Sequence, residues 1–201
     1  MTDNIDKYNK GNATVKNGAD DQKSDKTDNL ENNIEDNERK MVDVIIPTYR
    51  PAKEFGELLH RLEKQEYRPN RILVMNTGKE YWNSEWENYP LLEVHHLDQK
   101  DFDHGGTRKR AAELSTADIM VFMTQDALPA DRKMIGNLVR AVSRNSGTGA
   151  AYARQLPNAD CRFLERYTRS FNYPEQSSVK SLSDVETYGI KTYFCSNVCA
   201  A

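Results

Sequence analysis

Val42-Asp43-Val44-Ile45-Ile46-Pro47 is a short apolar run that ends at a proline. Runs of this kind are typical of strands buried on both faces of a parallel sheet. Pro51 can occupy the first position of a helix, where its missing N–H is not needed. From Phe55 to Leu62, apolar residues then recur at helical spacing, so the sequence predicts an amphipathic helix over about 51–66.

The alternation of strand and helix continues along the chain. Helices are predicted around Trp82 and Trp86, from Gly105-Gly106 to Leu114, from a capping Asp131 to about Ser143, and over 160–171. Further strands are predicted at 71–75, 91–97, 119–123 and 149–153, and at Tyr193-Phe194-Cys195 near the end. Strands that alternate with helices build a predominantly parallel sheet with helices on both faces, so the predicted fold class is α/β.

The first 40 residues differ in composition from the rest of the chain. Residues 1–40 contain eight Asn, no Phe, Trp or Cys, and 10 acidic against 7 basic side chains. A segment this polar buries too little apolar surface to offset the entropy that is lost when it becomes ordered. We therefore expect residues 1–40 to form a disordered polar tail and residues 41–201 to form the folded domain.

Charge and hydropathy exclude several classes of protein. The net charge of −3 arises in the tail, so residues 41–201 are neutral, which argues against a nucleic-acid-binding surface. The sequence has neither the run of about 18 apolar residues that a transmembrane helix needs nor the apolar stretch of a signal peptide. Cys161, Cys195 and Cys199 indicate reduced thiols rather than a disulfide framework. We expect a cytoplasmic protein and leave open a peripheral attachment to the inner face of the membrane.

In parallel sheets, ligands bind beyond the carboxyl ends of the strands. Four loops follow such ends in this sequence: 47–50, 76–78, 98–108 and 124–126. The last follows the most apolar predicted strand and brings Asp126 to the sheet edge, where a carboxylate can hold a divalent cation against a diphosphate. Hard oxygen ligands suit Mg²⁺ or Mn²⁺. A turn aspartate that merely caps the next helix is the alternative.

Gly105 and Gly106 precede three basic residues at 108–110. Glycines at a helix N-terminus let backbone N–H groups approach an anion, and the helix dipole favours its charge. A plain turn before a solvated charged helix remains the alternative. His95 and His96 are adjacent on a predicted strand, so they face opposite sides and do not form a metal-binding pair.

Taken together, these segments resemble family 2 glycosyltransferases of the GT-A fold. The resemblance rests on Val-Ile-Ile-Pro-Thr-Tyr-Arg at 44–50, Ile-Leu-Val-Met-Asn-Thr-Gly at 72–78 and Phe-Met-Thr-Gln-Asp at 122–126. Residues 102–112, 124–129 and 194–197 are similar to the rhamnosyltransferase-like branch. The resemblance implies that a sugar is transferred, with inversion, from a nucleotide diphosphate sugar to a hydroxyl of a glycan or lipid-linked glycan. In this branch, dTDP-rhamnose is the expected donor.

The resemblance also implies roles for individual residues. Asn76 stands where the family usually has an Asp that contacts the base, and Thr124 stands where it has the first Asp of an Asp-x-Asp motif. Asp126 matches the second Asp, which binds the Mg²⁺ or Mn²⁺, and Arg108 matches a basic position near the diphosphate. The nucleotide-sugar-binding residues implied are Pro47, Thr48, Arg50, Asn76, Thr77, Arg108, Thr124, Gln125 and Asp126.

The general base is expected beyond Ala201. In this family it is a carboxylate that follows the strand beginning near Phe194, and Glu165, Asp184 and Glu186 come too early. The glycosyltransferase domain is therefore expected to be incomplete at its C-terminus. Two alternatives stay open. One is a non-catalytic nucleotide-sugar-binding fragment or pseudo-enzyme. The other is a different α/β enzyme such as a nucleotidyltransferase, although residues 47–51 lack its glycine- and lysine-rich loop.

Overall fold

The computed structural model describes residues 39–158, 160–193, 196 and 198–201. Most of the predicted tail, residues 1–38, lies outside this part of the chain, as do Phe194 and Cys195 of the last predicted strand. The elements in chain order are β1 (Val42–Tyr49), α1 (Glu54–Glu63), β2 (Arg71–Thr77), η1 (Lys79–Tyr81), η2 (Ser84–Asn88), β3 (Leu92–Leu97), η3 (Gln99–Asp101), α2 (His104–Leu114), β4 (Ile119–Met123), α3 (Met134–Val142), α4 (Phe163–Asn172), η4 (Leu182–Asp184), α5 (Val185–Tyr188), η5 (Gly189–Tyr193) and β5 (Cys199–Ala200).

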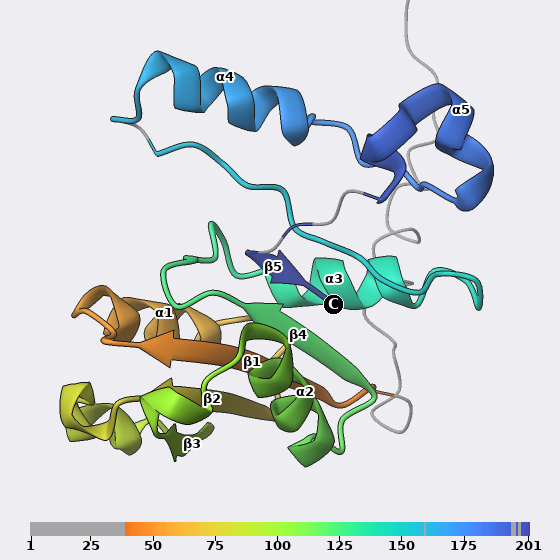
Figure 1. Ribbon diagram of the computed structural model, residues 1–201. Helices are drawn as coiled ribbons and strands as arrows, with labels where there is room; N and C mark the ends of the chain where they lie inside the picture. Colours follow the sequence, from red (N-terminus) through yellow and green to blue (C-terminus); the bar gives the residue numbers. More distant parts are fainter. Residues whose placement is uncertain (1–38, 159, 194–195, 197) are drawn as a thin grey trace, which may run out of the picture. The chain divides into compact units, whose positions relative to one another are not determined.

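The five strands form one sheet in the order β3-β2-β1-β4-β5 (Figure 1). β1 pairs in parallel with β2 and β4, β2 pairs in parallel with β3, and β5 runs antiparallel to β4. The predicted predominantly parallel sheet is therefore confirmed. The register sets Thr48 opposite Asn76 and Tyr49 opposite Thr77, so polar residues from neighbouring strands meet at the carboxyl ends.

Helices cover both faces of the sheet, and the period of two in each strand sorts its apolar residues between them. Phe55, Leu58, Leu59 and Leu62 of α1 pack with side chains of α3 against one face, where all four are fully buried or nearly so. Ala111 of α2 packs on the other face. Burying one such Leu or Phe stabilises the fold by about 1.5–3 kcal/mol, so this two-faced core fixes the strand ends in place.

Two predicted helices begin later than the sequence suggests. α1 begins at Glu54 instead of Pro51, and α3 begins at Met134 with Lys133 at its N-cap. The prediction that Asp131 caps this helix is wrong, because its Oδ1 accepts from the backbone N–H of Lys133 in the preceding turn. The buried side chain of Gln65 instead accepts from the N–H of Ile135, in the first turn of α3 (3.0 Å).

The predictions for the last two strands need correction. Residues 149–153 form no parallel strand; Ala151 exchanges two 2.7 Å backbone hydrogen bonds with Ala201, and Tyr152 makes an isolated antiparallel bridge. Tyr193 lies in η5, and the strand near the end of the chain is Cys199–Ala200. Both misassignments concern edge segments, whose pairing depends on contacts that are remote in sequence.

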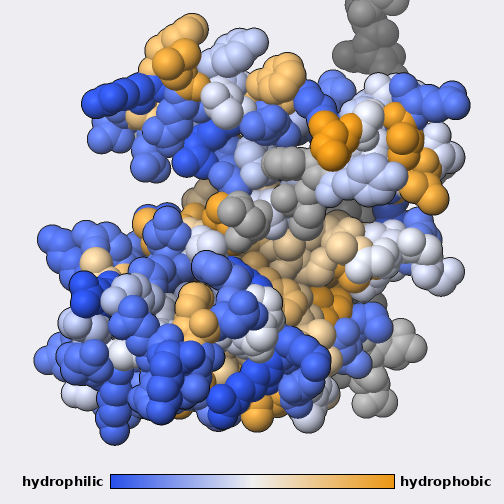
Figure 2. All heavy atoms as spheres, in the orientation of Figure 1, coloured by the Kyte–Doolittle hydropathy of each residue, from blue (hydrophilic) through white to orange (hydrophobic). Residues whose placement is uncertain are grey.

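The predicted helix over 160–171 is confirmed as α4 (Figure 1), but it contributes no buried residue to the core. Phe163 and Leu164 are 79% and 74% exposed, and Figure 2 shows apolar side chains on the surface in this part of the molecule. Cys161 and Cys199 are free thiols, and burial raises the pKa of Cys199 to about 12. Among the described residues, no helix is both long and apolar enough to cross a bilayer.

Candidate functional site

The carboxyl ends of β1, β2 and β3 are joined by buried hydrogen bonds. Thr48 Oγ1 donates to Asn76 Oδ1 (2.9 Å), and Asn76 Nδ2 lies 3.0 Å from Nδ1 of His96 and 3.3 Å from the carbonyl oxygen of Gly78. Thr48 and Asn76 are both buried. Both N–H groups of the Asn76 amide are thus used within the protein, where they hold three strand ends together.

His96 takes a defined tautomer in this arrangement. Because the amide N–H of Asn76 can only donate, Nδ1 of His96 accepts and the neutral ring carries its proton on Nε2. Burial and the positive charge of Lys79 lower the pKa of His96, which favours the neutral ring. The neighbouring His95 instead binds Glu93 (2.8 Å), so the two histidines have different partners, as the alternation along a strand requires.

Arg50 follows β1 and lies between two tyrosine rings. Its guanidinium carbon is 5.1 Å from the ring centroid of Tyr49 and 4.3 Å from that of Tyr81, and it donates to the Tyr81 hydroxyl (2.7 Å). The backbone of Arg50 has φ = 47°, the one left-handed non-glycine residue in the described chain. Such a conformation costs about 1–3 kcal/mol and is typical of functional sites. The guanidinium is thereby held at the strand end.

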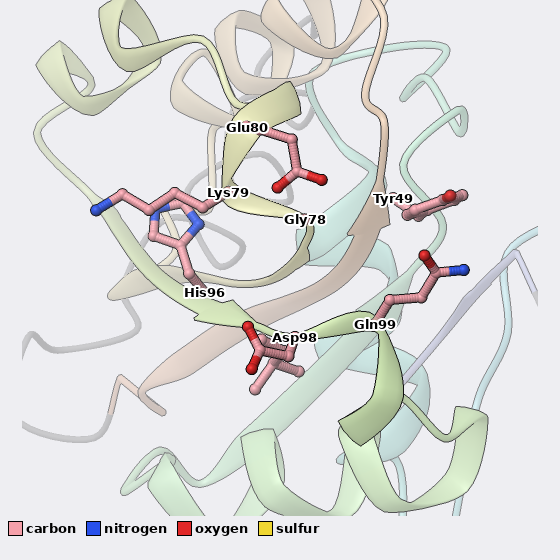
Figure 3. A pocket seen from close by; sticks show the side chains of 8 residues that line it. Tyr49, Gly78, Lys79, Glu80, His96, Asp98 and Gln99 are labelled. Carbon is pink, nitrogen blue, oxygen red and sulfur yellow. The ribbon is translucent and has the colours of Figure 1, made fainter.

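A cavity of about 250 Å³ opens beside Tyr49 (Figure 3). Its lining comes from the ends of three adjacent strands: Tyr49, Gly78, Lys79, Glu80, His96, Leu97, Asp98 and Gln99. In Figure 3 the Glu80 carboxylate points into the space between Gly78 and Tyr49, whereas the Lys79 ammonium points away from Tyr49. Complete ligand pockets measure roughly 300–1,000 Å³, so this cavity suits one part of a ligand, such as a base.

Gly78 makes the turn that shapes this cavity. Its φ is +80°, and a Cβ at this position would lie 2.9 Å from Cδ2 of Tyr81. Only glycine meets both conditions without strain. The Asn-Thr-Gly sequence after β2 therefore lets the chain turn tightly and bring η1, with Tyr81, back toward Arg50.

The loop after β4 contains the predicted metal ligand. Asp126 is exposed, and no hydrogen bond or ion pair to its carboxylate is found within the described residues. The loop is anchored on either side of it, since Thr124 N–H donates to the carbonyl of Val198 and Ala127 N–H donates to that of Thr124. The hydroxyls of Thr77 and Thr124 are buried and lack a partner in the described chain. At this edge the exposed carboxylate of Asp126 is therefore available to a ligand.

The N-terminus of α2 binds one of the protein's own carboxylates. Asp103 is the N-cap residue, and its side chain accepts from the N–H of Gly106. That N–H is therefore not available to a phosphate, and an ordinary capping role accounts for Gly106. Arg108 lies one turn into α2 and donates to the carbonyl of His104 (3.1 Å). In the described chain, no hydrogen bond or ion pair joins Arg108 to Asp126.

The structure brings several of the predicted residues together and adds others. Thr48 meets Asn76, Pro47 and Thr77 lie at the paired ends of β1 and β2, and Gln125 contacts the backbone beside Arg50. The cavity residues were not singled out in the sequence. The strand-end rule points to most of them, because Tyr49, Asp98 and Gln99 lie within predicted loops and Lys79 and Glu80 directly follow the loop 76–78.

Comparison with known proteins shows the family of this chain. The pattern described as Glycosyl transferase family 2 matches residues 43–201, which is well over half of the chain. The chain belongs to glycosyl transferase family 2. Its mostly parallel sheet flanked by helices is accordingly a GT-A-like fold, as the resemblance implied.

The curated relatives of this chain include two O-antigen chain rhamnosyltransferases. The chain is 39% identical over 167 residues to RfbN of Salmonella typhimurium and 29% identical over 160 residues to WbaN of Salmonella anatum. These matches cover 80% and 79% of this chain and 51% and 50% of the relatives. The chain thus spans about half the length of the curated relatives it matches.

Two solved structures share part of this arrangement. The mannosyltransferase PcManGT from Pyrobaculum calidifontis, in complex with GDP-Man and Mn²⁺, has a TM-score of 0.49 at 23% identity, covering 58% of this chain and 36% of its own. S. aureus TarS (residues 1–349) has a TM-score of 0.48 at 18% identity, covering 61% and 37%.

Proposed function

We propose that this chain binds a nucleotide diphosphate sugar at the carboxyl edge of its sheet and serves in the transfer of that sugar to a glycan hydroxyl. The observation that carries the proposal is the assembly at this edge, in a member of glycosyl transferase family 2, of a cavity, the strained Arg50 and the loop of Asp126. The hydrogen bonds between Gln125 and Tyr49 link the cavity to that loop.

The cavity beside Tyr49 receives the base in this proposal. Glu80 and Asp98 are exposed carboxylates in its lining and accept from ring N–H groups, such as N3–H of thymine. Tyr49 offers an aromatic edge for packing, and Nε2–H of His96 is a donor on the same lining. Similarity to two rhamnosyltransferases supports dTDP-rhamnose as the donor.

The diphosphate lies toward the other strand ends. Arg50 and Arg108 supply positive charge, and Thr77 and Thr124 lie at the end of β2 and directly after β4, where their buried hydroxyls bind the diphosphate only after the side chains turn toward it. Asp126 fits a Mg²⁺ or Mn²⁺ ion, because its carboxylate is exposed and free of protein partners among the described residues. Such an ion, when bound, neutralises negative charge on the departing diphosphate. One carboxylate binds it weakly, so the diphosphate oxygens supply most of the ligands.

Transfer proceeds in this proposal by a single displacement with inversion at the anomeric carbon. The acceptor is a glycan or lipid-linked glycan, and a lipid-linked acceptor would bring the protein to the inner face of the membrane as a peripheral protein. Deprotonation of the acceptor hydroxyl contributes roughly 10²- to 10⁴-fold to such reactions. Within the described chain we assign no general base.

A thermal-shift screen of nucleotide sugars, with Mn²⁺ and with chelator, tests the proposal. A ligand at about 100 times its Kd stabilises the folded state by ~2.7 kcal/mol. For a folded domain of this size, that corresponds to a rise in Tm of roughly 5–10 °C. We expect this rise with dTDP-rhamnose and Mn²⁺, a smaller one with chelator, and none with rhamnose alone.

A matched pair of variants makes the screen specific. Asp118 lies at the opposite end of the sheet, where its Oδ2 accepts from the N–H of Met41 (2.8 Å). Asp118→Asn keeps an acceptor oxygen and should retain the full ligand-induced shift. Arg50→Ala should lose most of it. If no nucleotide sugar raises the Tm of the unmodified protein, or if Arg50→Ala responds fully, the proposed site is wrong.

A further inference from the structure

Gln125 makes an unusual pair of hydrogen bonds across the sheet. Its Oε1 accepts from the backbone N–H of Tyr49 (2.8 Å), and its Nε2 donates to the backbone carbonyl of the same residue (3.2 Å). The two residues are 76 positions apart in sequence. An amide side chain that both accepts from and donates to one backbone residue reproduces the pair of bonds that a neighbouring strand makes.

The sheet itself explains why such a substitute is needed. β1 pairs with β4 only from Val42 to Ile45, whereas on its other side it pairs with β2 as far as Tyr49. The last four residues of β1 thus have a strand partner on one side only. Gln125 follows β4 by two residues and provides Tyr49 with the missing partner on the other side.

Tyr49, whose backbone Gln125 binds, is itself part of the candidate site. The ring of Tyr49 lines the cavity, and the next residue is Arg50, with its left-handed backbone and its guanidinium between Tyr49 and Tyr81. A strained backbone conformation persists only where contacts with the surrounding structure hold it in place. The bonds from Gln125 hold the residue immediately before the strained one, on the side that β4 leaves open.

We propose that Gln125 is a positioning residue that ties the wall of the nucleotide cavity to the loop of Asp126, and that it does not itself contact the donor. Its amide is committed to the backbone of Tyr49, and its immediate neighbour in the chain is Asp126. This role rests on the proposed function. It makes the shape of the base cavity and the position of the metal-binding carboxylate depend on each other.

Calorimetric titrations with dTDP and with dTMP, both with chelator so that a metal at Asp126 does not contribute, distinguish positioning from contact. If Gln125 acts through Tyr49, Gln125→Ala weakens both ligands by the same factor, of about tenfold, because the base cavity itself loosens. If Gln125 touched the β-phosphate, dTDP binding would weaken and dTMP binding would not, which would overturn the inference.

Two further variants sharpen the test. Tyr49→Ala keeps the backbone that Gln125 binds but removes the ring, so adding Gln125→Ala to it should weaken dTDP binding by less than twofold more; an additive loss contradicts the proposal. Gln125→Glu retains the acceptor and loses the donor, so its affinity should fall between those of the unmodified protein and Gln125→Ala.

Hydrogen–deuterium exchange gives a readout that does not depend on ligand. The amide of Tyr49 should exchange at least tenfold faster in Gln125→Ala, while amides of the β1–β4 ladder such as Ile45 keep their protection. Unchanged exchange at Tyr49 in Gln125→Ala overturns the inference. Absence of any dTDP binding to the unmodified protein counts against the proposed function instead, and the exchange result still decides whether Gln125 fixes the strand end.

Discussion

Both ends of the parallel sheet contain polar residues, but the two ends differ in how far these residues are paired within the protein. At the amino end, Asp43 is fully buried and accepts from Arg71 (2.8 Å), Ser115 (2.7 Å) and Asn70 (3.3 Å), while Arg71 also donates to Glu93 (2.7 Å). Charge there is neutralised within the protein, although Nε of Arg71 is buried without a hydrogen-bond partner in the described chain.

At the carboxyl end Thr48, Asn76 and His96 bind one another, but several other polar groups have no partner in the described chain. The hydroxyls of Thr77 and Thr124 are buried without a partner in the described chain, Asp126 is exposed, and Arg50 is held in a strained backbone conformation. Buried polar groups normally find partners. An end that saturates them contributes to stability, whereas an end that leaves them open is suited to a ligand.

The largest effect on stability is expected from Asp43→Ala. This change leaves the guanidinium of Arg71 and the hydroxyl of Ser115 without their common acceptor. Removing one partner of a buried ion pair costs 3–5 kcal/mol, and Arg71 is a quarter exposed, so we expect about 2–3 kcal/mol. Urea unfolding measures this loss. A loss below about 1 kcal/mol, or a loss of nucleotide affinity in the folded variant, would contradict the division between the two ends.

The same residue makes acid stability informative. Burial alone would raise the pKa of Asp43, but the hydrogen bonds from Arg71, Ser115 and Asn70 outweigh it and lower the pKa. A lowered pKa in the folded state gives stability that is complete above the ordinary carboxyl pKa and disappears as the pH falls through the lowered value. In Asp43→Asn, this acid-dependent part of the unfolding free energy should be absent when stability is measured from pH 7 down to about pH 2.

A smaller loss of stability is expected from Gly78→Ala. The left-handed backbone and the 2.9 Å approach of Tyr81 predict a cost of about 1–2 kcal/mol. Because Tyr81 must move, nucleotide binding should weaken too. Gly149→Ala is the control, since a Cβ there meets nothing within 4 Å and stability should change by less than about 0.5 kcal/mol. Equal unfolding midpoints for the two variants would argue against strain at Gly78.

Arg50→Gly should change stability least while still impairing the site. Glycine removes the strain of φ = 47°, but the hydrogen bond and the ring contact with Tyr81 are lost as well. Relief of the strain, about 1–3 kcal/mol, opposes the loss of two contacts worth about 1 kcal/mol each, so the net change should lie within about 1 kcal/mol. Nucleotide affinity, measured by calorimetry, should fall at least tenfold. Unchanged affinity would mean that the strain at Arg50 serves no ligand.

Much of the sheet could be predicted from the sequence, because its central strands follow a local pattern. Residues 42–47, 71–75 and 119–123 are continuous apolar runs, and burial on both faces of a parallel sheet produces such runs. Residues 149–153 and Tyr193 were misassigned, since their pairing depends on where the chain returns rather than on their own composition.

The candidate site could be located from the sequence but not described in detail. The rule about strand ends identified the loops of Asn76 and Asp126, yet it gave no sign that both N–H groups of Asn76 are used inside the protein. Nor could it show that Gln125 binds the backbone of Tyr49. Such bonds join residues far apart in sequence, and their partners are visible only once the register of the strands is known.

Calorimetric titration of dTDP into the protein and into Asp126→Asn, each with Mn²⁺ and with chelator, tests the central claim most directly. Asp126→Asn retains the shape and hydrogen-bonding capacity of the side chain but removes its charge. We predict a Kd that tightens strongly with Mn²⁺ in the unmodified protein and is insensitive to Mn²⁺ in the variant, with unfolding midpoints that agree. The same Mn²⁺ dependence in both proteins would show that Asp126 is only a turn residue and that the carboxyl end of the sheet is not the metal-assisted donor site.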